Sequence, residues 1–260
     1  MRVQSRKGDV RMKNYIFDLY GTLIDIHTNE SKPSLWRNMA SLLSLMGASY
    51  APGTLKKRYR ELVRSQRAER LPVMREKFGD DGLPEEDVEI CLERVFEQLL
   101  LERGVEADEK TLSQTGLAFR SLSLQYIRLY EGVPELLAGL GKAGKRVYLL
   151  SNAQRMFTEP EMKMLGIYDC FDGILYSSDA GVKKPSRHFY DTLFQNYCLE
   201  KQESVMIGNE YRADILGADA YGIRSMYVHT AQSGEKPDRL PESCRKIREI
   251  GSMIDRGGPE

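Results

Sequence analysis

The chain has 260 residues, with 38 Lys and Arg against 38 Asp and Glu and a formal net charge of zero. This length holds one α/β core and a smaller second domain, and it buries most of the surface of the unfolded chain. The charge balance argues against nucleic acid or an anionic membrane as a partner, since both attract strongly basic proteins.

Cysteine spacing and the start of the chain indicate the compartment. The four cysteines are Cys91, Cys170, Cys198 and Cys244. They form no Cys-x-x-Cys pair, so the sequence predicts reduced thiols and neither a zinc site nor a disulfide framework. No apolar run approaches the ~18 residues of a membrane-spanning helix, and residues 1–13 lack the apolar stretch of a signal peptide. We therefore expect a cytoplasmic protein, in which either Met1 or Met12 is the native start.

The first predicted strand is the apolar run Tyr15 to Phe17, which ends on Asp18 and breaks into a turn with Gly21 and Thr22. An Asp at the carboxyl end of a strand lies where open α/β sheets bind ligands. Glycine lets the backbone approach a ligand closely, and threonine adds a hydroxyl group and an amide donor. The turn is therefore a candidate functional segment, although a buried strand with an ordinary Asx turn has the same pattern.

A polar linker is predicted over residues 26–32, and helices follow it. Residues 34–130 hold no run of period 2, whereas apolar residues recur at helical spacing from Leu35 to Met46 and from Val88 to Leu100. Gly, Pro or clustered charge interrupts the pattern at 47–53, 77–84 and 104–108, which leaves about four helices.

Charge is uneven within this helical stretch. Residues 56–70 are strongly basic and residues 80–97 strongly acidic. Such runs are typical of solvated helix faces that neutralise each other, and the alternative for the basic run is a surface that reads an anionic substrate.

From residue 131 onward strand and helix patterns alternate, which indicates a parallel sheet covered on both faces. The predicted strands are 146–150, 173–177, 204–207 and 224–229. The predicted helices are 135–142, 159–165, 186–198 and 213–221. We expect a loop over 230–241, one short helix over 245–253 and a frayed end over 256–260.

Polar side chains follow the ends of these strands. Ser151 and Asn152 follow one, Asn209 and Asp214 follow another, and Lys184 leads into a helix through a proline. The carboxyl ends of parallel strands joined by right-handed crossovers fall on one edge of the sheet. These side chains are therefore expected to converge on Asp18.

The order and content of these segments resemble the haloacid dehalogenase-like hydrolase superfamily, in the subfamily with a helical cap inserted after the first core strand. The four motifs are Asp18-Leu19-Tyr20-Gly21-Thr22, Ser151-Asn152, Lys184-Pro185, and Gly208-Asn209 with Asp214. The resemblance implies a Rossmann-like parallel sheet core over 1–27 and 131–260 and an all-helical cap domain over 28–130.

The same resemblance implies roles for the residues of the four motifs. Asp18 is the expected nucleophile. Thr22, Ser151 and Asn152 are expected to hold the substrate anion, and Lys184 to screen its charge. Asp18, the backbone carbonyl of Tyr20, Asn209 and Asp214 are the expected ligands of Mg²⁺, whose preferred donors are oxygens.

Two residues depart from the phosphatases of this superfamily. Tyr20 stands where they carry a second Asp, which protonates the leaving alcohol and then activates water. A phenol with a pKa near ~10 cannot act as the base at neutral pH, and loss of general acid-base help costs roughly 10²- to 10⁴-fold in rate. Asn209 stands where a carboxylate is common, which leaves open whether Glu210 joins the metal site.

Three functions follow from these observations. The leading hypothesis is a Mg²⁺-dependent phosphatase that acts on a small phosphorylated metabolite through an aspartyl-phosphate, because Gly208, Asn209 and Asp214 have the spacing of the metal-dependent enzymes. Tyr20 favours the alternative, an L-2-haloacid dehalogenase that uses Asp18 without metal, since a departing halide needs no proton. The third is a non-catalytic ligand-binding or regulatory protein. We expect a small anionic substrate and a monomer or dimer.

Overall fold

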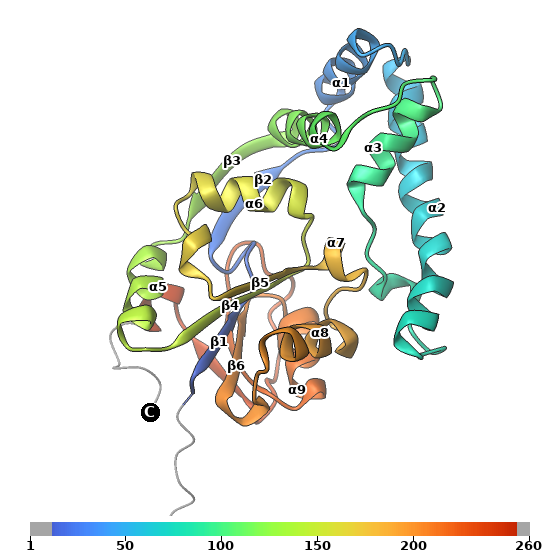
Figure 1. Ribbon diagram of the computed structural model, residues 1–260. Coiled ribbons are helices and arrows are strands. Elements are labelled where there is room, and N and C mark those ends of the chain that lie inside the picture. The colour runs from blue at the N-terminus through green and yellow to red at the C-terminus, as the bar shows by residue number, and fades with distance from the viewer. Residues whose placement is uncertain (1–11, 254–260) are drawn as a thin grey trace, which may run out of the picture.

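The computed structural model describes residues 12–253, and its centre is a six-stranded sheet (Figure 1). The strand order is β5-β4-β1-β6-β7-β8, and every neighbouring pair is parallel. The strands are β1 (Asn14–Phe17), β4 (Arg146–Ser151), β5 (Gly173–Tyr176), β6 (Ser204–Gly208), β7 (Arg224–Val228) and β8 (Cys244–Ile247). The predicted α/β, Rossmann-like fold is confirmed.

Both faces of the sheet are buried. Successive side chains of a strand point to opposite faces, so Tyr15 and Phe17 pack on one side with helix α5 (Val133–Lys142). Ile16 packs on the other side with α8 (Arg187–Tyr197) and α9 (Gly217–Tyr221). Short apolar runs without polar alternation are what a sheet covered on two faces requires, which explains why these strands could be read from the sequence.

The remaining elements of the core are short. They are the helices α6 (Arg155–Met164) and α7 (Ser177–Ala180), a π-helical turn η4 (Tyr211–Leu216), and the 3₁₀ turns η2 (Tyr168–Cys170), η3 (Lys201–Glu203) and η5 (Ile250–Met253). The prediction of a helix over 245–253 was wrong for most of its length, because Cys244–Ile247 pairs with β7 as the edge strand β8. The frayed end predicted over 256–260 and the extension over 1–11 lie outside the described residues.

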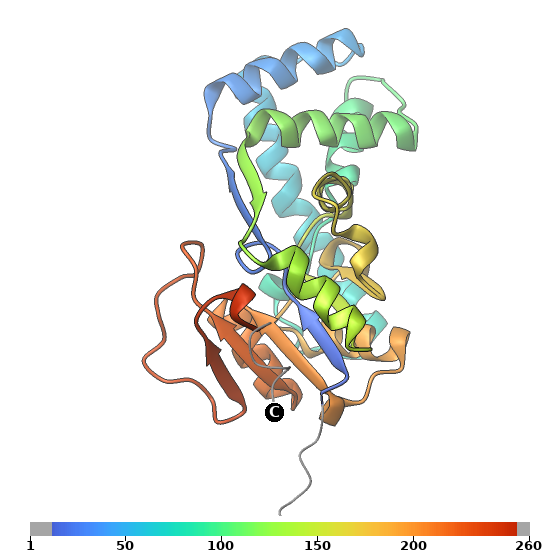
Figure 2. The same cartoon turned by 90° about the vertical axis from the view of Figure 1, so that its left-hand side faces the viewer.

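Residues 33–123 form what we call the helical segment, which lies above the sheet in Figure 2. It contains α1 (Pro33–Leu45), α2 (Pro52–Phe78), the 3₁₀ turn η1 (Glu85–Asp87), α3 (Leu92–Leu101) and α4 (Glu109–Ser123). Its own core contains Trp36, Phe96 and Phe119, and Met156 and Phe157 of α6 pack into that core. The four predicted helices are present, with breaks where Gly, Pro and charge interrupt the sequence pattern.

A two-stranded antiparallel ribbon joins the helical segment to the sheet (Figure 2). It consists of β2 (Ile24–Thr28) and β3 (Leu124–Leu129). The sequence analysis placed a linker at 26–32 and no strand within 34–130, so both strands of the ribbon differ from the prediction. β3 alternates imperfectly between half-buried and exposed residues, because a free ribbon has no face buried along its whole length. The domain boundaries at 28 and 130 therefore fall within or just beyond this ribbon.

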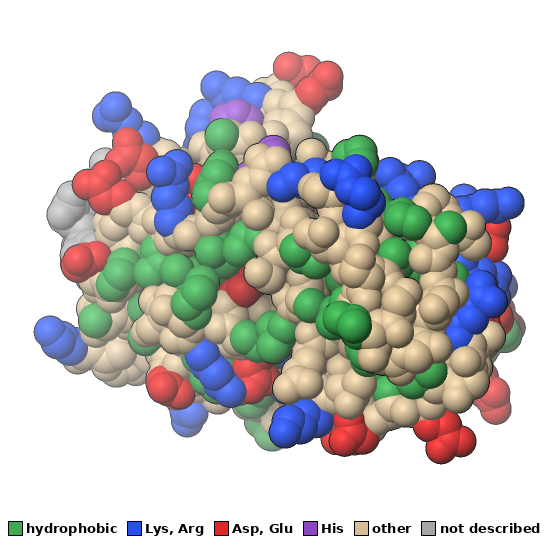
Figure 3. All heavy atoms as spheres, turned by 90° about the horizontal axis from the view of Figure 1, so that it is seen from above, with side chains coloured by type: hydrophobic (Ala, Val, Ile, Leu, Met, Phe, Trp, Pro, Cys, Tyr) green, Lys and Arg blue, Asp and Glu red, His purple; other side chains and the backbone are tan. Residues whose placement is uncertain are grey.

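The surface carries charges of both signs. On the face seen in Figure 3, Lys and Arg side chains and Asp and Glu side chains both lie around the outline, with hydrophobic side chains between them. Among the helices of residues 12–253, none combines the length and the apolar composition needed to cross a lipid bilayer.

Candidate functional site

Asp18 follows the last residue of β1, at the carboxyl edge of the sheet. Its amide donates to the carbonyl of Ile207 in β6 at 2.9 Å, which continues the parallel pairing by one residue. The chain then turns sharply, since the amides of Thr22, Leu23 and Ile24 all point to the carbonyl of Leu19. This turn leaves the Asp18 side chain at the end of the strand, where it faces the ends of neighbouring strands.

Gly21 is required at this turn for two reasons. Its φ of +84° lies in the left-handed region that side chains disfavour. A Cβ atom at this position would also lie 2.4 Å from the Nδ2 atom of Asn209. The glycine of the first motif therefore lets the turn over residues 18–24, which we call the Asp18 loop, pack directly against the loop that follows β6.

Lys184 joins two carboxylates at the centre of the site. Its Nζ atom lies 2.7 Å from Oδ1 of Asp18 and 2.7 Å from Oδ1 of Asp214. The lysine side chain is 1% exposed and that of Asp214 is 0% exposed. Burial alone would lower the pKa of Lys184, but the charges and hydrogen bonds of Asp18 and Asp214 outweigh burial and raise it. Lys184 is therefore an ammonium ion held between two acids.

Asp214 is the more deeply buried of the two acids. Burial raises its pKa above the usual range and the negative charge of Asp18 adds to the rise, while Lys184 opposes it. The amide of Glu210 donates to its Oδ2 atom at 2.8 Å, and a Cβ atom on Gly208 would lie 2.2 Å from that same oxygen. Asp214 belongs to the π-helical turn η4, a conformation that is frequent at functional sites.

The remaining motif residues surround this ionic cluster. The Thr22 hydroxyl lies 3.3 Å from Oδ2 of Asp18 and 3.1 Å from Oδ1 of Asn209. The Asn152 amide group bonds both sides of the Lys184 backbone, with its Nδ2 donating to the carbonyl at 3.1 Å and its Oδ1 accepting from the amide at 2.8 Å. Ser151 is buried at the end of β4. All the predicted side chains thus lie at one edge of the sheet, and Asn152 fixes the loop that carries the lysine.

The donor set suits a hard cation. Asp18 and Asp214 supply carboxylate oxygens and Asn209 an amide oxygen, which are the ligand types that Mg²⁺ prefers. Within residues 12–253, no group of three or more His, Cys, Asp and Glu side chains is arranged to hold a metal. A cation at this place would therefore complete its shell with amide, backbone and water oxygens, as Mg²⁺ usually does.

Sequence comparison identifies the family. The profile of haloacid dehalogenase-like hydrolases matches residues 12–222, which include all four motifs. The chain belongs to the haloacid dehalogenase-like hydrolase family. Glyceraldehyde 3-phosphate phosphatase of Methanothermobacter thermautotrophicus is 24% identical over 137 residues, which are 53% of this chain and 61% of the relative. The chain thus spans about three fifths of the length of this curated relative.

Solved structures of the haloacid dehalogenase-like hydrolases share the fold. The 2-haloacid dehalogenase of Pseudomonas syringae pv. Tomato is similar with a TM-score of 0.60 and 16% identity, covering 94% of this chain and 97% of that one. The magnesium-bound structure of the HAD-hydrolase YfnB from Bacillus subtilis gives 0.52 and 20%, covering 94% and 98%. Both likenesses concern the fold, since the identities are low.

Tyr20, the residue that departs from the family's phosphatases, is held in a second ionic cluster. Its hydroxyl donates to the Glu161 carboxylate and lies 3.0 Å from Oγ1 of Thr158, both on α6. Arg120 of α4 donates to Glu161 at 2.5 Å and lies over the Tyr20 ring. Burial, followed by the charge of Glu161, raises the pKa of Tyr20 well above its ordinary value. Tyr20 therefore stays protonated and is no base in this haloacid dehalogenase-like hydrolase.

A cavity of about 340 Å³ opens beside Lys184, lined by Glu86, Asp87, Glu89, Asn152, Lys183, Lys184, Pro185, Glu210, Arg212 and Ala213. Three of these acids come from the helical segment, within the stretch that the sequence analysis read as solvated. Asp87 and Glu89 are instead only 9% exposed. No motif points to either of them, and the same is true of Arg120 and Glu161, because acids and bases on amphipathic helices ordinarily face water.

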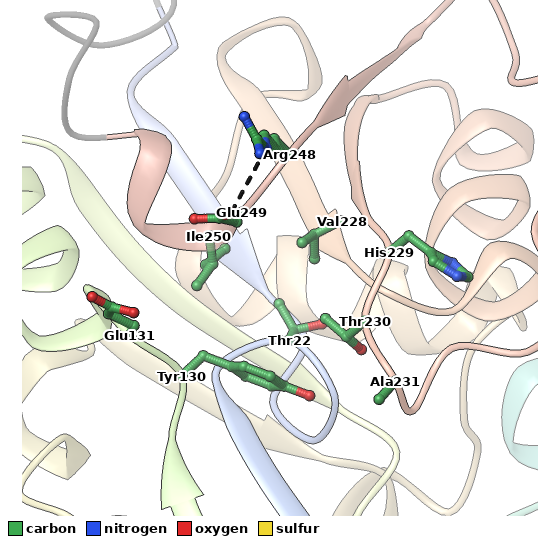
Figure 4. Close-up of a pocket in the computed structure, with 10 residues that line it drawn as sticks. All are labelled: Thr22, Tyr130, Glu131, Val228, His229, Thr230, Ala231, Arg248, Glu249 and Ile250. Carbon is green, nitrogen blue, oxygen red and sulfur yellow. Dashed lines mark ion pairs between the residues drawn. The ribbon is translucent and has the colours of Figure 1, made fainter.

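A second cavity of about 270 Å³ borders the Asp18 loop at Thr22 (Figure 4). Thr22, Tyr130 and Thr230 are among the residues that line it. The Thr230 hydroxyl donates to the carbonyl of Gly21 at 2.8 Å. Asp18, Lys184 and Asp214 are not among its lining residues, and it borders the Asp18 loop through Thr22.

Proposed function

We propose that this chain is a Mg²⁺-dependent phosphatase that hydrolyses a small phosphorylated metabolite through an aspartyl-phosphate on Asp18. The observation that carries the proposal is the buried cluster in which one ammonium serves two carboxylates. The cluster has one negative charge in excess, and a phosphate dianion would add two more. A divalent cation beside Asp18 and Asp214 removes this repulsion, which a metal-free reaction of a haloacid does not need to the same extent.

The chemistry of the protein residues follows from their positions. The Oδ1 atom of Asp18 is bonded to Lys184, so Oδ2 is the oxygen that can attack phosphorus in line. The Lys184 ammonium and the hydroxyl groups of Thr22 and Ser151 would stabilise the equatorial oxygens. Asn152 contributes by fixing the Lys184 backbone. To donate to a phosphate oxygen, its Nδ2 atom would have to give up its hydrogen bond to the Lys184 carbonyl.

Mg²⁺ would be held by the carboxylates of Asp18 and Asp214, the side chain of Asn209 and the backbone carbonyl of Tyr20. When bound, the cation neutralises charge on the transferred phosphoryl group. Two observations on other proteins agree with this assignment: the YfnB structure was solved with magnesium, and the Methanothermobacter relative is named as a phosphatase. We also propose that the helical segment acts as the cap of the site, with boundaries near 28 and 130, and that the protein works in the cytoplasm.

A substrate panel separates this function from its rivals. The purified chain would be offered phosphomonoesters, acetyl phosphate and 2-haloacids, each with Mg²⁺ and with a chelator. We expect Mg²⁺-dependent release of phosphate that is lost in Asp18→Asn, since the amide cannot form the covalent ester. Halide release that persists with the chelator would instead favour the dehalogenase, and binding of a phosphorylated ligand without turnover would favour a regulatory protein.

A further inference from the structure

The proposed reaction lacks a proton donor among the four motifs. An alcohol leaving group departs as an unstable alkoxide unless it is protonated in the transition state. Tyr20 is bonded to Glu161 and keeps its proton, as its raised pKa requires. The donor must therefore come from outside the four motifs, and the cavity beside Lys184 is lined by four acids.

The acids of this cavity differ in what holds them. The Glu89 carboxylate accepts hydrogen bonds from the Ser177 hydroxyl at 2.8 Å and from the Ile90 amide at 2.9 Å, so it has a structural role. The Glu86 side chain is 64% exposed and pairs loosely with Arg212 at 3.7 Å. The Glu210 side chain is exposed to solvent.

Asp87 is the exception. The residue is only 9% exposed and lines the cavity, and within residues 12–253 burial and the charges of Glu86, Arg212 and Lys183, with no hydrogen bond, are what act on its carboxyl group. Its carboxyl group is therefore available to a molecule bound in the cavity, whereas that of Glu89 is already engaged.

The backbone around Asp87 is fixed to the loop that delivers Lys184. The carbonyl of Asp87 accepts from the Lys183 amide at 2.9 Å, and the Glu89 amide donates to the carbonyl of Gly181 at 2.9 Å. Val88 and Val182 form a β-bridge between these two bonds. An acid from the helical segment is thus held at a fixed register beside the cationic residue of the site.

We propose that Asp87 is the proton donor to the leaving group, in the place that Tyr20 cannot fill, and that the substrate is accordingly the phosphate ester of an alcohol. This inference rests on the proposed function. As Asp18 forms its bond to phosphorus and the phosphorus–oxygen ester bond breaks, the Asp87 carboxyl group gives its proton to the departing oxygen. The resulting Asp87 carboxylate then takes a proton from the water that attacks the aspartyl-phosphate. Phosphate is released, Asp18 returns as a carboxylate, and Asp87 is protonated again.

The electrostatic surroundings of Asp87 suit both halves of this cycle. Burial and, after it, the charge of Glu86 raise the pKa of Asp87, whereas Arg212 and Lys183 lower it. A raised pKa increases the fraction of the acid that holds a proton near neutral pH. The two nearby cations then stabilise the carboxylate that forms after the proton has left.

Leaving-group dependence tests the assignment. Para-substituted phenyl phosphates, from nitrophenyl to methoxyphenyl, share one shape but differ in the acidity of the alcohol. For Asp87→Asn we expect kcat/KM to fall by roughly 10²- to 10⁴-fold with methoxyphenyl phosphate and by only about threefold or less with nitrophenyl phosphate, since nitrophenolate departs without a proton. Nitrophenol should also appear in a burst of one equivalent per chain, because the variant hydrolyses its aspartyl-phosphate slowly.

Two control variants make the result specific. Glu86→Gln removes a neighbouring charge from the same turn and should leave the slope along the series unchanged. Asp87→Glu keeps the acid and should restore part of the methoxyphenyl activity. Equal melting temperatures of Asp87→Asn and wild type would show that the loss is not one of folding.

The outcomes separate this inference from the function on which it rests. Equal losses along the series, or no loss in Asp87→Asn, would overturn the role of Asp87 while leaving the phosphatase intact. If the wild-type chain releases no phosphate from any of these esters in the presence of Mg²⁺, both proposals fall.

Discussion

Asp18 and Tyr20 of the Asp18 loop belong to two separate ionic clusters, which differ in charge balance. In the first, Lys184 serves both Asp18 and Asp214, so one negative charge is left over. In the second, Arg120 forms an ion pair with Glu161, and the third member is the neutral phenol of Tyr20. The charges of the second cluster cancel, whereas with both carboxylates ionised the first cluster needs another positive charge to become neutral. An uncompensated charge favours binding of a cation at the first cluster, whereas the neutral second cluster has a structural role, which is to join α4 to α6.

The strongest test of the contrast is removal of the shared cation. Lys184→Met leaves two buried carboxylates without their counter-ion, which should destabilise the fold by about 3–5 kcal/mol and abolish activity. Chemical denaturation and turnover measure the two effects. Lys183→Met, one residue away and less buried, is the matched control, and equal stability of the two variants would contradict the interpretation of the first cluster.

The excess charge also predicts a response to cations. Mg²⁺ at a hundredfold excess over its Kd should stabilise the folded chain by about 2.7 kcal/mol, since it binds only the folded state. Differential scanning calorimetry at constant ionic strength measures this change. In Asp214→Asn the response should shrink strongly, and an equal response in both proteins would place the cation elsewhere.

In the cluster of Arg120, Glu161 and Tyr20, loss of either charged partner should lower the stability of the fold more than loss of both. Glu161→Gln leaves Arg120, whose side chain is 15% exposed, without its carboxylate, and we expect a loss of about 1.5–3 kcal/mol. The double variant with Arg120→Met should recover part of this loss, as replaced buried ion pairs often do. Additive losses in the urea-unfolding cycle would argue against the pairing.

The smallest predicted effect concerns the ribbon and depends on pH. The Asp25 carboxylate accepts from Arg128 at 2.8 Å, from Gln232 at 2.9 Å and from Tyr126 at 3.2 Å. Burial would raise the pKa of Asp25, but these bonds outweigh it and lower the value. A lowered pKa means that the stabilisation is present above about pH 4 and is lost as the pH falls through the folded-state pKa.

Asp25→Asn should therefore cost about 1–2 kcal/mol at pH 7 and progressively less in acid. Urea unfolding of wild type and variant at several pH values measures the difference. Asp238→Asn is a control, since Asp238 is an exposed acid of the 230–241 loop. A gap between wild type and Asp25→Asn that stays constant down to pH 3 would refute the assigned bonds.

Much of the fold could be predicted from the sequence because the buried strands are continuous apolar runs. β1, β4 and β6 are hydrophobic on both faces, and the polar residues that follow them mark the edge of the sheet where the motif residues meet. The ribbon could not be predicted in this way, since its strands are half exposed and paired only with each other. The edge strand β8 has the same difficulty, with two of its four residues exposed.

The parts of the site that escaped prediction have a common physical cause. Asp87, Arg120 and Glu161 lie in stretches whose composition is that of ordinary charged helix surface. They are buried only because the helical segment packs against α6 and the 181–183 loop, which is a tertiary contact without a local signal. A sequence pattern indicates which face of a helix or strand packs on its own core. It does not indicate which charged residues become buried when another part of the chain packs against that element.

The bridge between Val88 and Val182 has a consequence for turnover. The helical segment contacts the rest of the chain through the ribbon, through its packing on α6, and through the two backbone hydrogen bonds beside this bridge. For a molecule too large for the cavity beside Lys184, entry and release would require the two hydrogen bonds at this bridge to break. Each catalytic cycle on such a substrate would then include an opening step that moves Asp87 away from the reaction centre. The acid would be in place only while the hydrogen bonds at this bridge are formed.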